Sequence, residues 1–182
     1  AHAAADLLSQ AEHDKMASPV LVTDSIELAN AVRAELEKQI PLLSRSEIAR
    51  ESIDNNGKII VADNLEKVIE ISNEIAPEHL ELLLDEPFKY LDLIRHAGSI
   101  FMGRYCPEAL GDYYAGPNHT LPTSGTAKFS SPLSVDDFIK KTQYTYYTKE
   151  ALDKVANDVA YFAEKEGLTA HAKSAVIRTE EN

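Results

Sequence analysis

Residues 19–40 indicate the fold of this chain, and they read PVLVTDSIELANAVRAELEKQI. The first five residues, 19–23, are mostly apolar and predict a short buried strand. Asp24 and Ser25 follow as N-cap residues, and apolar side chains then recur at helical spacing as far as Pro41. We therefore expect a strand that leads directly into a helix.

The same pattern occurs again further along the chain. Residues 58–62 (KIIVA) predict a second strand, Asp63 and Asn64 a second cap, and residues 65–71 a second helix. A third strand is expected at residues 99–102, which lie between two glycines. Strands that alternate with helices favour an α/β fold with a parallel sheet.

Further helices are expected on both sides of these strands. Pro77 is typical of a first helical position, and Gly167 is typical of the residue that follows a helix. The expected helices cover residues 3–16, 77–84, 150–166 and 169–177, and a short helix entering an extended piece is expected over residues 135–147.

Residues 106–134 show no periodicity and mix glycine and proline with hydroxyl and aromatic side chains. Connections in compact domains usually run to about 4–6 residues. A segment this long therefore favours a functional loop over a merely variable one.

Composition excludes several classes of protein. Hydrophobic residues make up 44% and charged residues 26% of the 182 residues, which is typical of a folded chain. Thirty acids against eighteen bases give a net charge of −12, so no basic stripe is available to bind nucleic acid. The apolar runs are too short for a membrane-spanning helix, which needs about 20 residues. The seven glycines include no Gly-x-Gly-x-x-Gly fingerprint for a dinucleotide.

The single cysteine and the N-terminus bear on location. Cys106 cannot form an internal disulfide, which fits a reducing cytosol and predicts a cytoplasmic protein. No basic neighbour is present to activate its thiol, so we interpret it as a packing residue. The chain begins directly in an expected helix, without an initiator methionine or the pattern of a signal peptide.

Two pairs of polar residues are candidates for chemistry. Gln10 and His13 lie three apart on one helical face, where both could reach a metal; a solvated polar face is the alternative. Glu78 and His79 lie at an expected helix start. Histidine there could act as a general base and the carboxylate could activate water. The alternative is an acid placed to suit the helix dipole.

The aperiodic segment and the last helix junction hold further candidates. Asp112 and His119 lie in GDYYAGPNH (111–119), where they could ligate a metal or hold a polar substrate; a simple turn is the alternative. Glu166 ends one expected helix and His171 opens the next. The acid of Glu166 opposes the usual preference of the helix dipole, and His171 would oppose it if protonated, which indicates another use for these side chains.

Several longer motifs occur in order along the chain. They are APEHLEL (76–82), AGSIF (97–101), PEALGDY (107–113) and GPNHTLPTSGTA (116–127), with shorter ones at residues 8–14, 129–138 and 168–171. Together they resemble the histidinol dehydrogenase family over essentially the whole chain.

The resemblance implies an NAD-dependent oxidation of L-histidinol, through L-histidinal, to L-histidine, with a zinc ion that positions the substrate. The family's zinc is held by a glutamine, two histidines and an aspartate. These ligands correspond here to Gln10, His13, Asp112 and His171. Such nitrogen and oxygen ligands suit zinc.

The resemblance also implies a role for each remaining candidate. His79 would remove the alcohol proton, and Glu78 would activate the water that attacks the aldehyde. Tyr113 is a further candidate to line the site. The residues implied to contact substrate are Gln10, His13, His79, Asp112, His119, Glu166 and His171.

Length is the main departure from the family, whose members are more than twice as long. The resemblance implies that this chain corresponds to the C-terminal part and that most NAD contacts lie in an N-terminal part outside it. Residues 1–133 would form an incomplete Rossmann-like parallel sheet with flanking helices that carries the zinc ligands and the Glu-His pair. Residues 134–182 would form a small helical C-terminal domain.

In the family that domain crosses to the partner of a homodimer, so Glu166 and His171 would complete the neighbour's site. Cys106 and His96 depart from the family pattern, and neither is an expected ligand.

Two other hypotheses stay open. The chain could be a non-catalytic zinc-binding, substrate-binding or oligomerisation module, or a metal-dependent hydrolase that uses Glu78 without NAD.

Overall fold

The strand and helix predicted over residues 19–40 are confirmed by the computed structural model, which describes residues 1–180. Strand β1 (Val20–Thr23) leads into helix α2 (Ile26–Gln39), which continues as a 3-10 turn, η1 (Ile40–Leu42). The hydroxyl of Ser25 caps α2 by accepting the N–H of Leu28 at 3.1 Å. A cap of this kind contributes about 1 kcal/mol.

Strand β2 (Lys58–Val61) pairs with β1 in parallel, with β1 residue Val20 opposite Lys58. The crossover between them contains a second helix, α3 (Ser46–Asn56), which the sequence analysis did not predict. Arg45 precedes α3 without a side-chain cap, and the helix buries only Ala49 and Ser52. Its short apolar stripe explains why periodicity did not reveal it.

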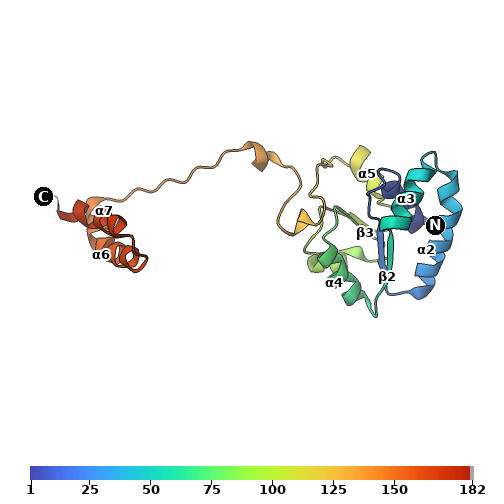
Figure 1. Cartoon of the computed structure of the whole chain (residues 1–182), viewed down its shortest axis with the longest axis horizontal. Coiled ribbons are helices and arrows are strands. Elements are labelled where there is room, and N and C mark those ends of the chain that lie inside the picture. Colours follow the sequence, from blue (N-terminus) through green and yellow to red (C-terminus); the bar gives the residue numbers. More distant parts are fainter. Residues whose placement is uncertain (181–182) are drawn as a thin grey trace. The chain divides into compact units, whose positions relative to one another are not determined.

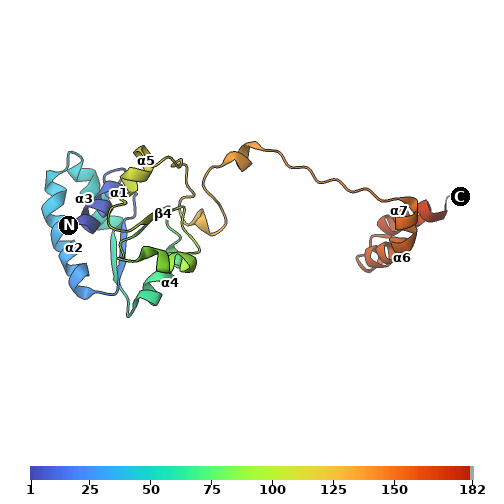
Figure 2. The same cartoon turned by 180° about the vertical axis from the view of Figure 1, so that it is seen from behind.

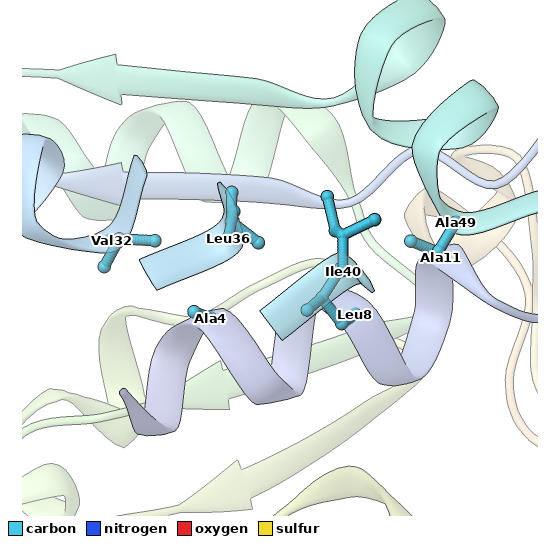
Figure 3. Close-up of a cluster of buried hydrophobic side chains, with 7 residues drawn as sticks. All are labelled: Ala4, Leu8, Ala11, Val32, Leu36, Ile40 and Ala49. Carbon is cyan, nitrogen blue, oxygen red and sulfur yellow. The ribbon is translucent and has the colours of Figure 1, made fainter. Parts of the chain in front are cut away.

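The main hydrophobic core lies between α2, α3 and the N-terminal helix α1 (His2–Ala11) (Figure 3). Small side chains let these helices approach closely, and each larger side chain contributes about 1.5–3 kcal/mol on burial. The buried residues are Ala4, Leu8, Ala11, Val32, Leu36, Ile40 and Ala49. This packing fixes the orientation of α1, which carries Gln10.

Helix α4 (Leu65–Ile75) begins at Asn64, whose side chain accepts the N–H of Lys67 at 2.9 Å. The helix ends at Ala76, in the left-handed conformation with φ 52°. The chain then enters strand β3 (His79–Leu82), so the helix predicted over residues 77–84 is wrong. Glu78 and His79 therefore do not lie at a helix start.

Residues 79–82 form a strand rather than a helix because they pair with a segment about twenty residues further along the chain. Strand β4 (Ser99–Met102), which was predicted, runs parallel to β3. The N–H groups of Gly98 and Ser99 donate to the carbonyls of Pro77 and Glu78 at 2.9 and 2.8 Å. A Cβ atom on Gly98 would lie 2.5 Å from the Glu78 carbonyl oxygen, so only glycine permits this approach.

The segment between β3 and β4 contains a 3-10 helix, η2 (Pro87–Leu93). Asn73 of α4 holds its end: Nδ2 donates to the Leu93 carbonyl at 2.9 Å, and Oδ1 accepts the Arg95 N–H at 2.7 Å. The residues described form two separate two-stranded sheets, β1-β2 and β3-β4. The predicted α/β class with parallel strands is confirmed, as two strand pairs flanked by helices (Figure 1).

The segment after β4 is less irregular than predicted. It contains helix α5 (Glu108–Tyr113), seen beside β4 in Figure 2, and a 3-10 turn, η3 (Thr126–Lys128). The 3-10 turn η4 (Val135–Phe138) then precedes an exposed extended piece, as predicted.

The chain divides into two compact units, Ala1–Phe138 and a second that starts at Ile139. The second unit contains helices α6 (Lys149–Lys165) and α7 (Thr169–Glu180), which pack through alanines such as Ala156 and Ala172. Gly167, with φ 77°, turns the chain between them, as predicted. The functional division at residues 133 and 134 stays a prediction.

None of the helices in residues 1–180 is long and apolar enough to span a membrane.

Candidate functional site

Three elements of the first unit each carry two or more polar side chains on one face. Helix α1 carries Asp6 and Gln10, which are four residues apart. The helix predicted over residues 3–16 ends early, at Ala11, so His13 lies in the turn after it and does not share a helical face with Gln10. Strand β3 carries His79 and Glu81, two residues apart and therefore on the same face. Helix α5 carries Glu108 and Asp112, four residues apart.

His79, Glu108 and Asp112 form the centre of the site. Their potential ligand atoms all lie within 4.8 Å of one another. The Nε2 of His79 lies 3.8 Å from Oε1 of Glu108, too far for a direct hydrogen bond. The side chain of Glu108 is only 5% exposed and that of His79 is 15% exposed. The cluster is therefore shielded from most of the solvent, and it is one that could hold a metal ion.

Burial changes the proton affinity of Glu108. Desolvation, followed by the hydrogen bond and charge of Asp112, raises the pKa of Glu108 to about 7, while Gln10 and Ser9 act in the opposite direction. Two acids this close repel each other unless a proton or a cation lies between them. The α5 carboxyl pair is thus suited to positive charge.

His79 is biased toward its neutral form. Burial is the largest influence and lowers its pKa; His13 and His119 also lower it, against the opposing charges of Glu78 and Asp112. These influences place all four residues in the neighbourhood of His79. A neutral imidazole can accept a proton near neutral pH.

An aromatic ring holds His79 from one side. The ring of Phe101, on β4, lies 5.9 Å from that of His79 at an angle of 49°. A Cβ atom on Gly111 would lie 2.4 Å from Cε1 of Phe101. Glycine between Glu108 and Asp112 therefore lets α5 pack directly on the ring that supports His79.

Gln10 approaches this centre from α1, and His13 lies in the turn that follows the helix. The Nε2 of Gln10 is buried and makes no hydrogen bond of good geometry within residues 1–180, although Gln10 lies close enough to Glu108 to lower its pKa. Rotating the amide by half a turn would present its oxygen instead. His13 is exposed, and its carbonyl accepts a hydrogen bond from Arg45 at 3.2 Å.

The remaining predicted residues are more exposed. His119 lies in the segment after α5, and Tyr113 at the end of α5 is 81% exposed. Glu166 and His171 belong to the second unit, where Glu166 caps the C-terminus of α6 and His171 lies in the first turn of α7. Both are exposed within that unit.

Sequence reasoning missed Asp6, Glu81 and Glu108. The spacing of Glu108 and Asp112 was a usable signal, because residues four apart share a helical face. The erroneous helix over residues 77–84 concealed Glu81, since His79 and Glu81 share a face in a strand and not in a helix.

The chain is similar to known proteins throughout its length. The sequence model of the histidinol dehydrogenase family matches residues 1–179. A histidinol dehydrogenase of Bacillus cereus is 59% identical over 178 residues, covering 98% of this chain and 42% of that protein. One from Caldanaerobacter subterraneus is 60% identical over 177 residues, covering 97% of this chain and 41% of that protein.

Solved structures agree. The crystal structure of histidinol dehydrogenase from Elizabethkingia anophelis matches with a TM-score of 0.84 and 39% identity, over 97% of this chain and 41% of that one. The chain thus spans about two fifths of the length of these relatives. Because the family model covers nearly every residue, the chain belongs to the histidinol dehydrogenase family.

Proposed function

We propose that this chain supplies the metal- and substrate-binding part of an NAD-dependent oxidoreductase that converts L-histidinol, through L-histidinal, to L-histidine. One observation supports the proposal. The side chains of Gln10, His79 and Asp112 lie near one another around a shielded centre, although they belong to three elements far apart in sequence: α1, β3 and α5. Membership of the family supplies the reaction class and the substrate.

The first unit fits a zinc ion through its donor set and its buried amide. Gln10, His13 and Asp112 would hold the ion there, with His171 as the fourth ligand. The unmade hydrogen bond of the buried Gln10 amide supports this fit, because an amide turned toward a metal offers it an oxygen. Zinc, when bound, orients the imidazole and amino nitrogens of the substrate.

His79 is suited to remove the alcohol proton. Burial lowers its pKa, so the imidazole is neutral and able to accept that proton near neutral pH. Glu78 directly precedes it and would activate the water that attacks the aldehyde before the second oxidation. NAD, when bound, would supply the hydride acceptor for each oxidation, and we assign no residue of this chain to its binding.

His119 and Glu166 would bind substrate, with Glu166 pairing with the cationic amino group. Glu166 and His171 both lie in the second unit. We propose that this unit crosses to the partner in a cytoplasmic homodimer, so that each site uses residues of two subunits.

Mixed dimers of the full-length enzyme test this arrangement. A His79→Asn subunit and a His171→Ala subunit would each form inactive homodimers. Co-expressed with different affinity tags, they should regain activity in the purified mixed dimer, because one of its two sites would combine both intact residues. Verified mixed dimers without activity would contradict the shared site. Zinc and histidinol binding without any NAD reduction by the full-length enzyme would favour a non-catalytic module.

A further inference from the structure

Glu81 links the three elements that form the site, because it belongs to β3 and contacts residues of α1 and α5. It lies on β3, two residues after His79, and it is half-buried. Its Oε1 accepts the backbone N–H of Glu108 at 3.2 Å. Pro107, which precedes α5, provides no side-chain cap. Glu81 therefore satisfies the first backbone donor of the helix that carries Asp112.

The carboxyl of Glu81 also approaches α1. Oε2 is buried and takes no hydrogen bond from an N–H or hydroxyl donor within residues 1–180. The carboxyl of Asp6 lies within hydrogen-bond reach of Glu81. Two facing carboxyls form a hydrogen bond only when one of them holds a proton. Asp6 lies one helical turn before Gln10, so this contact ties β3 to the face of α1 that carries Gln10.

We propose that Glu81 is a positioning residue, which fixes α1 and α5 against β3 and so sets Gln10 and Asp112 around His79. The metal-binding consequence rests on the proposed function, whereas the structural link between the three elements does not. Because one carboxyl contacts both α5 and α1, a side chain that keeps only one of these contacts leaves the opposite helix free to shift.

Replacing Glu81 with glutamine tests whether Glu81 acts through its hydrogen bonds or through its negative charge. In Glu81→Gln, the amide oxygen can still accept the Glu108 N–H and the amide nitrogen can donate to Asp6. In Asp6→Asn, the new amide can donate to Glu81. Glu81→Leu keeps much of the volume and removes both contacts. Ile69→Val, a buried change on α4 away from the site, controls for lost stability.

Amide hydrogen exchange and zinc binding of the chain test the proposal together. Exchange at the Glu108 amide should become about tenfold or more faster in Glu81→Leu, because the hydrogen bond to a carboxylate is lost. Glu81→Gln and Asp6→Asn should exchange like the wild type. Zinc affinity, measured by competition with a chelating dye, should fall at least about tenfold in Glu81→Leu and stay within about twofold in Glu81→Gln and Ile69→Val.

Each outcome bears on a different claim. Unchanged exchange at Glu108 in Glu81→Leu, or equal loss in Glu81→Gln, overturns the positioning role. If the variants show the expected exchange at Glu108 but the wild-type chain binds no zinc, the positioning role is supported and the zinc site of the proposed function is contradicted. If Ile69→Val and Glu81→Leu lose zinc affinity equally, the loss follows from lower stability of the fold. That result would also overturn the proposed role of Glu81 in positioning the zinc ligands.

Discussion

Replacing Glu81 with glutamine should make the free energy of unfolding less dependent on pH. In the folded chain burial, followed by the charge of Asp6, raises the pKa of Glu81 from 4.5 to about 7. The folded state therefore holds a proton that the unfolded state releases between these two values. By linkage, this stabilising contribution is complete below about pH 4.5 and is lost as the pH rises through about 7.

The magnitude follows from the size of the shift. A pKa difference of about 2.5 units corresponds to about 3 kcal/mol at most, and the partial exposure of Glu81 reduces this to about 1–3 kcal/mol. Glutamine cannot ionise and still reaches both partners. Between about pH 5 and 8, the wild type should therefore lose about 1–3 kcal/mol more stability than Glu81→Gln does.

Urea denaturation followed by circular dichroism at several pH values measures this difference. Asp6, Glu108 and His79 also surround Glu81 and titrate in both proteins, so the difference between the two profiles is the informative quantity. Glu66→Gln, on the exposed side of α4, is a matched control and should follow the wild type. Parallel profiles for the wild type and Glu81→Gln would refute the account of a buried, proton-holding carboxyl.

Three other predictions concern the site and its support. Asp112→Ala and His13→Ala should each weaken zinc affinity by at least about tenfold in chelator competition, and unchanged affinity would remove them from the ligand set. His79→Asn in the full-length enzyme should lower kcat by about 10²–10⁴-fold, because the general base is lost, and a wild-type rate would exclude that role. Gly111→Ala should destabilise the chain by about 1–3 kcal/mol in urea denaturation, because its Cβ would lie 2.4 Å from Phe101; an unchanged midpoint would show that the ring can move.

Local signals were sufficient for most of the elements. The Ser25 and Asn64 caps, with apolar spacing after them, correctly predicted α2 and α4. They failed at residues 77–84, where PEHLELLL suits a helix as well as a strand. Hydrogen bonds from Gly98 and Ser99, about twenty residues away, select the strand, and no local pattern encodes that pairing.

Spacing alone predicted the candidate site as separate pairs, and only the resemblance to a family joined them into one centre. Spacing placed Gln10 beside His13, and the resemblance to a family connected them with Asp112. Periodicity contains no information about which elements meet in space, so the shielding of His79 by Glu108 required the structure. Glu81 was invisible for the same reason, because its partners lie on two other elements.

Calorimetric titration of the chain with L-histidinol, in the presence and absence of zinc, tests the central claim most directly. The account predicts binding that requires zinc and that is weakened at least about tenfold by Gln10→Ala and by Asp112→Ala. Equal binding with and without zinc, or binding that neither substitution changes, would show that α1, β3 and α5 do not form the substrate site.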